Sequence, residues 1–126
     1  MESQTDLDTK IGNTESITLQ AKPVKVIKVE IRKVEIKGKQ NEKLVAICKH
    51  PDREKTIEIS QVKYEAKGKL VISGLWISKD KQNLLIKNSA LAVFLRNLNC
   101  QSMRELENKE VPTIQDEKGY LIFKAY

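Results

Sequence analysis

Apolar and polar residues alternate from Val24 to Ile36, and this alternation limits the choice of fold more than any other part of the sequence. A period of two is typical of a β-strand. The apolar positions share one parity at Val24 and Val26, change parity at Ile27 and change back at Val34. Each change would turn apolar side chains to the opposite face of a sheet, so each requires a bulge or a bend. The sequence therefore predicts a long, strongly curved first strand, as small barrels require.

The rest of the chain predicts shorter strands and two helices. The segment 43–49 is apolar on both parities, so both of its faces should be covered. The segment 70–78 has almost no polar face and is the best candidate for the central strand. Ser89 is placed as the N-cap of one helix, and Ser102 with Glu105 forms a capping box before another. The expected order is strands at 24–36, 43–49, 56–64 and 70–78, helices after 89 and 102, and strands at 111–114 and 120–125.

These elements define an α+β fold in which β-structure dominates. We expect a small curled sheet or barrel of about six strands, with a short helical pair before the last two strands. Residues 1–20 are polar and acidic, which predicts a flexible leader, and residues 21–126 are expected to form a single β-rich domain. The order of elements resembles the oligonucleotide-binding (OB) barrel, which also has a long bent first strand, hairpins and a helix before its final strands. The resemblance is one of topology, and it implies an OB-like fold. No residue motif of that family is present, so no site residues can be carried over from it.

Composition indicates the class of protein and its compartment. No apolar run reaches the roughly 18 residues that a membrane span needs, and the segment 1–10 is too polar and acidic for a secretory signal. Two cysteines, Cys48 and Cys100, indicate reduced thiols rather than a disulfide scaffold. We therefore expect a cytoplasmic protein that does not enter a membrane. The excess of lysine over arginine, 19 to 4, and of glutamate over aspartate, 12 to 5, favours a thermophilic source.

Catalytic and metal sites find little support in the sequence. Cys48 and His50 offer two metal ligands, but a structural zinc site needs four and the chain has one histidine. The same pair has no third group that would orient it as nucleophile and base. All five glycines are isolated, and none lies in a Gly-rich phosphate-binding turn. We expect no metal, no cofactor and no enzymatic activity, and a magnesium-dependent nuclease, which needs carboxylates from separate strands, is the third-ranked hypothesis.

Positive charge is concentrated in one segment. Residues 22–87 hold 17 basic and 8 acidic residues, a net charge of +9, while residues 1–21 sum to −3 and residues 88–126 to zero. Such segregation favours a polyanionic partner, although lysines in strands also serve to block pairing between sheet edges. Tyr64 ends a strand beside a basic turn, where it is either a base-stacking residue or an ordinary rim tyrosine, whereas Trp76 is expected in the core. The predicted nucleic-acid-binding residues are Lys37, Lys39, Lys43, Tyr64, Lys67, Lys69, Lys79 and Lys81.

The leading hypothesis is a non-enzymatic module that binds single-stranded DNA or RNA, largely through backbone phosphates and with low sequence specificity. It requires the turn lysines to converge at one end of the sheet. The alternative is a protein-interaction or assembly subunit that forms a homo-oligomer or binds another protein without binding nucleic acid. In that case the edge of the first strand, or the terminal hairpin with Tyr120, Phe123 and Tyr126, would dock the partner.

Overall fold

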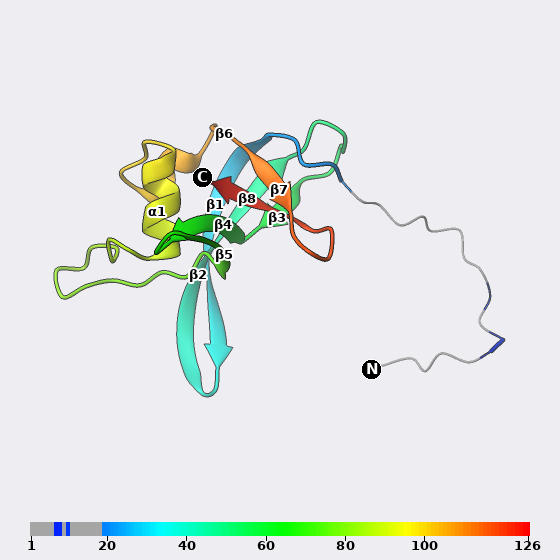
Figure 1. Ribbon diagram of the computed structural model, residues 1–126. Helices are drawn as coiled ribbons and strands as arrows, with labels where there is room; N and C mark the ends of the chain where they lie inside the picture. The colour runs from blue at the N-terminus through cyan, green and yellow to red at the C-terminus, as the bar shows by residue number, and fades with distance from the viewer. Residues whose placement is uncertain (1–6, 9, 11–18) are drawn as a thin grey trace.

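Two curled sheets dominate the computed structural model of the protein (Figure 1). The structure describes residues 7, 8, 10 and 19–126, so most of the predicted leader at 1–20 lies outside the described residues. One sheet has the strand order β3-β2-β1-β6 and the other β5-β4-β8-β7. The predicted β-dominated, curled architecture is confirmed. The strands are β1 (Val24–Ile36), β2 (Lys39–Lys49), β3 (Ile57–Ile59), β4 (Gln61–Ala66), β5 (Lys69–Gly74), β6 (Glu110–Val111), β7 (Thr113–Gln115) and β8 (Leu121–Ala125).

The first strand, β1, forms a long hairpin with β2 that extends past the core (Figure 1). A register shift between Val26 and Lys28 marks a bulge at the first predicted change of parity. At the second change, near Val34, the register is continuous. No bulge is needed there, because Ile31 and Ile36 are 54% and 42% exposed and neither face has to meet a core. The expected curvature is therefore introduced at one point of β1 and not at two.

The next strand, β2, is covered on both faces near its end, as predicted. Leu44, Ala46 and Cys48 are fully buried on one face, and Val45 is buried on the other. The neighbouring strands β1 and β3 pair with its two edges. β2 is therefore an interior strand of the first sheet.

The segment 56–78 differs from the prediction in two ways. A break at Ser60 divides the expected strand at 56–64 into β3, which pairs with β2, and β4, which pairs with β5 and β8. The prediction of a central strand at 70–78 is wrong, because β5 ends at Gly74 and lies at the edge of its sheet. After Gly74 the chain crosses to β2, where the Leu44 N–H donates to the Leu75 carbonyl oxygen at 2.9 Å. An apolar run alone does not distinguish a buried strand from an exposed edge.

Both predicted helix starts are found. In α1 (Ala90–Asn97) the Ala92 N–H donates to the Ser89 hydroxyl oxygen at 3.2 Å, as expected of an N-cap. The second helix is the 3₁₀ turn η1 (Met103–Leu106), where the Glu105 carboxylate accepts from the Ser102 N–H at 2.9 Å. No helix in the described part of the chain is long and apolar enough to cross a membrane.

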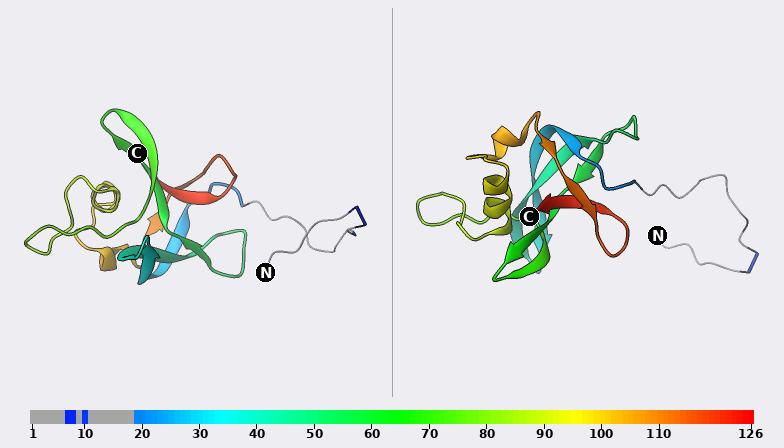
Figure 2. Two further views of the ribbon diagram at one scale, coloured as in Figure 1. Left: turned by 90° about the horizontal axis from the view of Figure 1, so that it is seen from below. Right: turned by 45° about the horizontal axis from the view of Figure 1, so that its top comes forward.

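The core lies between the sheets and the apolar stripe of α1 (Figure 2). Phe94 of α1 stacks on Phe123 of β8 with ring centroids 4.8 Å apart, and both side chains are fully buried. The suggestion that Phe123 docks a partner is therefore wrong, because its ring is fully buried in this core. Tyr120 and Tyr126, by contrast, are exposed.

The Cys48 thiol gives the fold a pH dependence at alkaline pH. Burial raises its pKa to about 12, whereas an unfolded chain releases this proton near pH 9. Above about pH 9 the unfolded state therefore binds fewer protons than the folded state, so the free energy of unfolding should fall by about 1.4 kcal/mol per pH unit. Urea denaturation of the wild type and of Cys48→Ala, between about pH 8 and 11, measures this slope. Equal slopes in the two proteins would contradict the prediction.

Candidate functional site

A surface hollow between β4 and α1 brings three cations and an aromatic residue together. It has a volume of about 610 Å³, and its polar and aromatic lining includes Tyr64, Lys67, Lys87 and Arg96. We call this site the basic hollow. Among the described lining residues Glu65 is the one carboxylate, so cations exceed anions there by three to one. The remaining lining residues are Ala66, Asn88 and Val93.

The turn between β4 and β5 contributes Lys67 to the lining of the basic hollow. Lys67 and Gly68 both have positive φ, 52° and 77°, which is the conformation of a two-residue hairpin turn. The β1–β2 hairpin has the same turn, with φ of 50° at Lys37 and 79° at Gly38. Asn or Asp is the usual residue at this first position, because a left-handed conformation costs other residues about 1 kcal/mol. Lysine at both turns therefore costs some stability and places a cation at each hairpin tip.

A second cation and aromatic pair lies where β5 ends. The Lys43 ammonium nitrogen is 5.0 Å from the centroid of the Trp76 ring. A Cβ at Gly74 would lie only 2.8 Å from the Trp76 Nε1, so the pair packs closely against this glycine. Trp76 is half-buried and lines a smaller hollow beside the β1–β2 hairpin, together with Ile36. The expectation that Trp76 belongs to the buried core is therefore wrong.

The predicted site residues are distributed over three projecting turns. Lys37 and Lys39 lie at the tip of the β1–β2 hairpin, which points downward in Figure 1. Lys79 and Lys81 lie in the long loop between β5 and α1, which extends to the left in the same view. Tyr64 and Lys67 line one hollow, Lys69 begins β5 beside them, and Lys43 contacts Trp76 instead. The structure thus brings Tyr64 and Lys67 together, while the other turn lysines extend in different directions.

Two residues of the basic hollow, Lys87 and Arg96, were missed by sequence reasoning. The Arg96 guanidinium donates to the Lys87 carbonyl oxygen at 2.7 Å, which fixes the end of α1 against the preceding loop. Arg96 follows Val93 by three positions, so both lie on the same flank of the helix. The sequence shows this flank, but it does not show that β4 lies beside it.

Two basic residues of β1, Lys28 and Arg32, are used differently, because acidic side chains neutralise them. Arg32 of β1 bridges Glu58 of β3 at 2.6 Å and Glu30 at 2.9 Å, and Lys28 also contacts Glu30. Hydrogen bonds from Arg32 lower the pKa of both carboxyl groups, which therefore stay ionised on this face. Acidic residues alternate with basic ones along this strand, and these ion pairs show that they lower its local positive charge.

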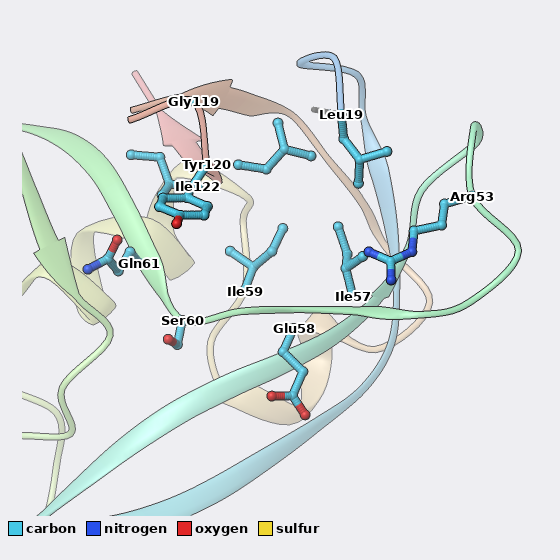
Figure 3. A pocket seen from close by; sticks show the side chains of 11 residues that line it. Leu19, Arg53, Ile57, Glu58, Ile59, Ser60, Gln61, Gly119, Tyr120 and Ile122 are labelled. Atoms are coloured by element: carbon cyan, nitrogen blue, oxygen red, sulfur yellow. The ribbon is translucent and has the colours of Figure 1, made fainter. Parts of the chain in front are cut away.

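Another hollow, between β3 and β8, is chemically different (Figure 3). It has a volume of about 440 Å³, and its lining mixes aliphatic side chains with polar ones such as Ser60 and Gln61. Figure 3 shows Ile57 of β3 and Leu19 pointing toward each other, with Arg53 and Glu58 at the same end. The exposed Tyr120 lies at the opposite end of the lining. Among its described lining residues the cation Arg53 is balanced by the carboxylate of Glu58, so this hollow lacks the excess of positive charge that the basic hollow offers to a polyanion.

The described residues offer no candidate metal site. Within residues 7, 8, 10 and 19–126, no group of three or more His, Cys, Asp or Glu side chains is arranged to hold a metal ion. His50 is fully buried and bonded through both ring nitrogens to backbone groups.

Comparison of the chain with protein-family models, curated proteins and solved structures finds no match.

Proposed function

We propose that this protein is a non-enzymatic module that binds single-stranded DNA or RNA, mainly through backbone phosphates and with low sequence specificity. The observation that carries the proposal is the basic hollow, where Tyr64 shares one surface depression with Lys67, Lys87 and Arg96. Cations that track the backbone, combined with an aromatic ring on which a base stacks, are the means by which proteins bind single strands without reading sequence.

The chemistry of the basic hollow suits a single strand better than a small molecule. Phosphates that contact Lys67, Lys87 and Arg96 would release condensed counterions, which makes binding favourable and dependent on salt. The Tyr64 ring is half-buried and held by the core, so stacking a base on it costs little conformational entropy. Glu65 in the same lining disfavours an approach of phosphate from its side and would orient the strand toward the cations.

An OB-like architecture is part of this proposal. The bulged, bent β1, its hairpin with β2 and the helix α1 before the last strands support it. In OB folds the loop between the first two strands contacts the oligonucleotide. Lys37 occupies that loop here, in the same turn conformation as Lys67. We therefore include the β1–β2 tip as a second contact for a longer strand.

Salt dependence tests the proposal directly. If the three cations of the basic hollow each meet one phosphate, affinity for a labelled mixed-sequence oligonucleotide should fall about 20-fold between about 50 and 200 mM salt. Fluorescence anisotropy measures this affinity, and a metal-supplemented sample checks that the oligonucleotide stays intact. Joint replacement of Lys67, Lys87 and Arg96 by glutamate should abolish binding. Absent binding at low salt, or binding that salt does not weaken, would disprove the proposal.

The Lys-Gly turns provide a matched variant that preserves the fold. Lys67→Asn removes a charge but suits the left-handed conformation, so it should leave stability unchanged or raise it while reducing the salt slope by about 0.7. Lys55→Asn, in the exposed β2–β3 loop, is the control and should change neither quantity. Tyr64→Phe should retain affinity and Tyr64→Leu should lose it, because only phenylalanine keeps a ring for stacking. Equal effects of Lys67→Asn and Lys55→Asn would place the binding surface elsewhere.

A further inference from the structure

Within residues 19–126, one edge of β5 has no partner strand and is exposed. β5 is an edge strand, and its consecutive residues Leu70, Val71 and Ile72 are 47%, 37% and 43% exposed. Side chains alternate between the two faces of a strand, so both faces of β5 present aliphatic surface. Figure 2 shows the β4–β5 hairpin projecting from the rest of the protein in its left view. Such a strand is a ready template for pairing with another chain.

Other edges of the two sheets are protected. Edge strands β3, β6 and β7 have three residues or fewer, whereas β5 has six. The part of β1 beyond its short pairing with β6 carries many charges, among them Lys28, Glu30 and Arg32. Short strands and charged side chains are the usual protection against edge pairing. β5 has neither, since its one charged residue, Lys69, is at its start.

The hydrogen-bond pattern identifies which backbone groups are available. Leu75 N–H donates to the Ser60 carbonyl oxygen, and the register continues through Val71 opposite Tyr64. Because antiparallel pairs alternate, the peptide groups of Val71 face β4 and those of Leu70 and Ile72 face away. The Gly74 carbonyl oxygen accepts from the Ser73 hydroxyl at 3.0 Å. Leu70 and Ile72 therefore carry the free donors and acceptors in the middle of the edge.

We propose that β5 pairs with β5 of a second copy of this chain, antiparallel and about a two-fold axis at Val71. In this register Leu70 lies opposite Ile72 of the second copy, and the two residues exchange the backbone hydrogen bonds that β4 leaves unused. Lys69 lies opposite Ser73, so no like charges face each other across the pair. The contact is isologous and closes at two copies, as most homo-oligomeric interfaces do. The inference depends on β5 alone and not on nucleic-acid binding.

Analytical ultracentrifugation of the full chain, without nucleic acid, tests the pairing. The mass should rise with concentration from 14.4 kDa toward twice that value. Val71→Lys places two lysines on the axis and should weaken the dimer at least about tenfold. Ile31→Lys makes the same change at an exposed isoleucine on β1 and should leave the dimer unchanged. A monomer at all concentrations up to about 1 mM, or a dimer that tolerates Val71→Lys, would overturn the proposal.

Disulfide cross-linking tests the register of the two β5 strands with a substitution at an exposed position, which should leave the fold intact. Val71→Cys would place two thiols at a non-hydrogen-bonded pair, where Cβ separations suit a disulfide. Mild oxidation should link this variant between chains, while Ile31→Cys should remain unlinked. The native Cys48 and Cys100 are buried and do not interfere. Oligonucleotide binding is measured separately on the wild-type protein, at concentrations below those at which it dimerises, because Val71 lies opposite Tyr64 of the basic hollow. The two proposals can therefore fail independently.

Discussion

Phe94→Ala is expected to reduce the free energy of unfolding by about 3–5 kcal/mol, enough to unfold much of the protein. The ring is fully buried and stacks on Phe123, which joins α1 to the second sheet. Its removal leaves a cavity, and it also removes the aromatic contact, which adds about 0.5–1.5 kcal/mol. Chemical denaturation with urea measures the loss, and a double-mutant cycle with Phe123→Ala isolates the contact between the rings.

Controls separate core packing from a general loss of apolar side chains. Leu84→Ala removes an exposed leucine and should change stability by less than about 0.5 kcal/mol. Phe94→Leu keeps most of the volume and should cost less than the alanine variant. A loss below about 1 kcal/mol for Phe94→Ala would show that α1 is not packed on β8 as described.

His50→Ala is expected to have the second largest effect, about 3 kcal/mol. The imidazole is fully buried, its Nδ1 accepts from the Asp52 N–H at 3.0 Å, and its Nε2 donates to the Gln20 carbonyl oxygen at 2.8 Å. Alanine would remove both hydrogen bonds, each with a net value of about 1 kcal/mol, and it would leave a cavity where the ring is packed. The Lys22–Asp52 ion pair, at 2.8 Å, joins the same two segments but is too exposed to compensate.

Two conservative variants divide this cost. The amide oxygen of His50→Asn lies near the position of Nδ1 and should restore the bond from Asp52, whereas the amide nitrogen of His50→Gln lies near Nε2 and should restore the bond to Gln20. Each should recover part of the stability lost in His50→Ala, as measured by urea denaturation. If neither variant is more stable than His50→Ala, packing rather than hydrogen bonding explains the role of His50.

Local features of the fold could be read from the sequence. The bulge in β1 followed from the change of apolar parity after Val26, and the N-cap of α1 followed from Ser89. Both depend on interactions between residues close together in the chain, where spacing and side-chain chemistry determine the outcome. The Glu105 contact to the Ser102 N–H is of the same kind.

Features that depend on distant segments could not be read in this way. The residues 70–72 are as apolar as a central strand, yet they are exposed because, among the described residues, no strand pairs with the outer edge of β5. Trp76 is half-buried for a similar reason, since the chain leaves β5 at Gly74. Lys87 and Arg96 join Tyr64 only because α1 packs beside β4. Hydrophobicity shows which residues benefit from burial, but the tertiary arrangement determines which ones are buried.

The position of β8 in its sheet has a consequence for folding. The β1–β2 and β4–β5 hairpins are local and can form early, but β8 inserts between β4 and β7 and runs parallel to β4, with Val62 opposite Phe123. Pairing between residues so far apart in the chain is slow, because the entropy of closing the loop is lost before contacts form. Until β8 docks, the β4–β5 hairpin has two open edges instead of one. We therefore expect aggregation during refolding to compete with the docking of β8, and to increase with protein concentration.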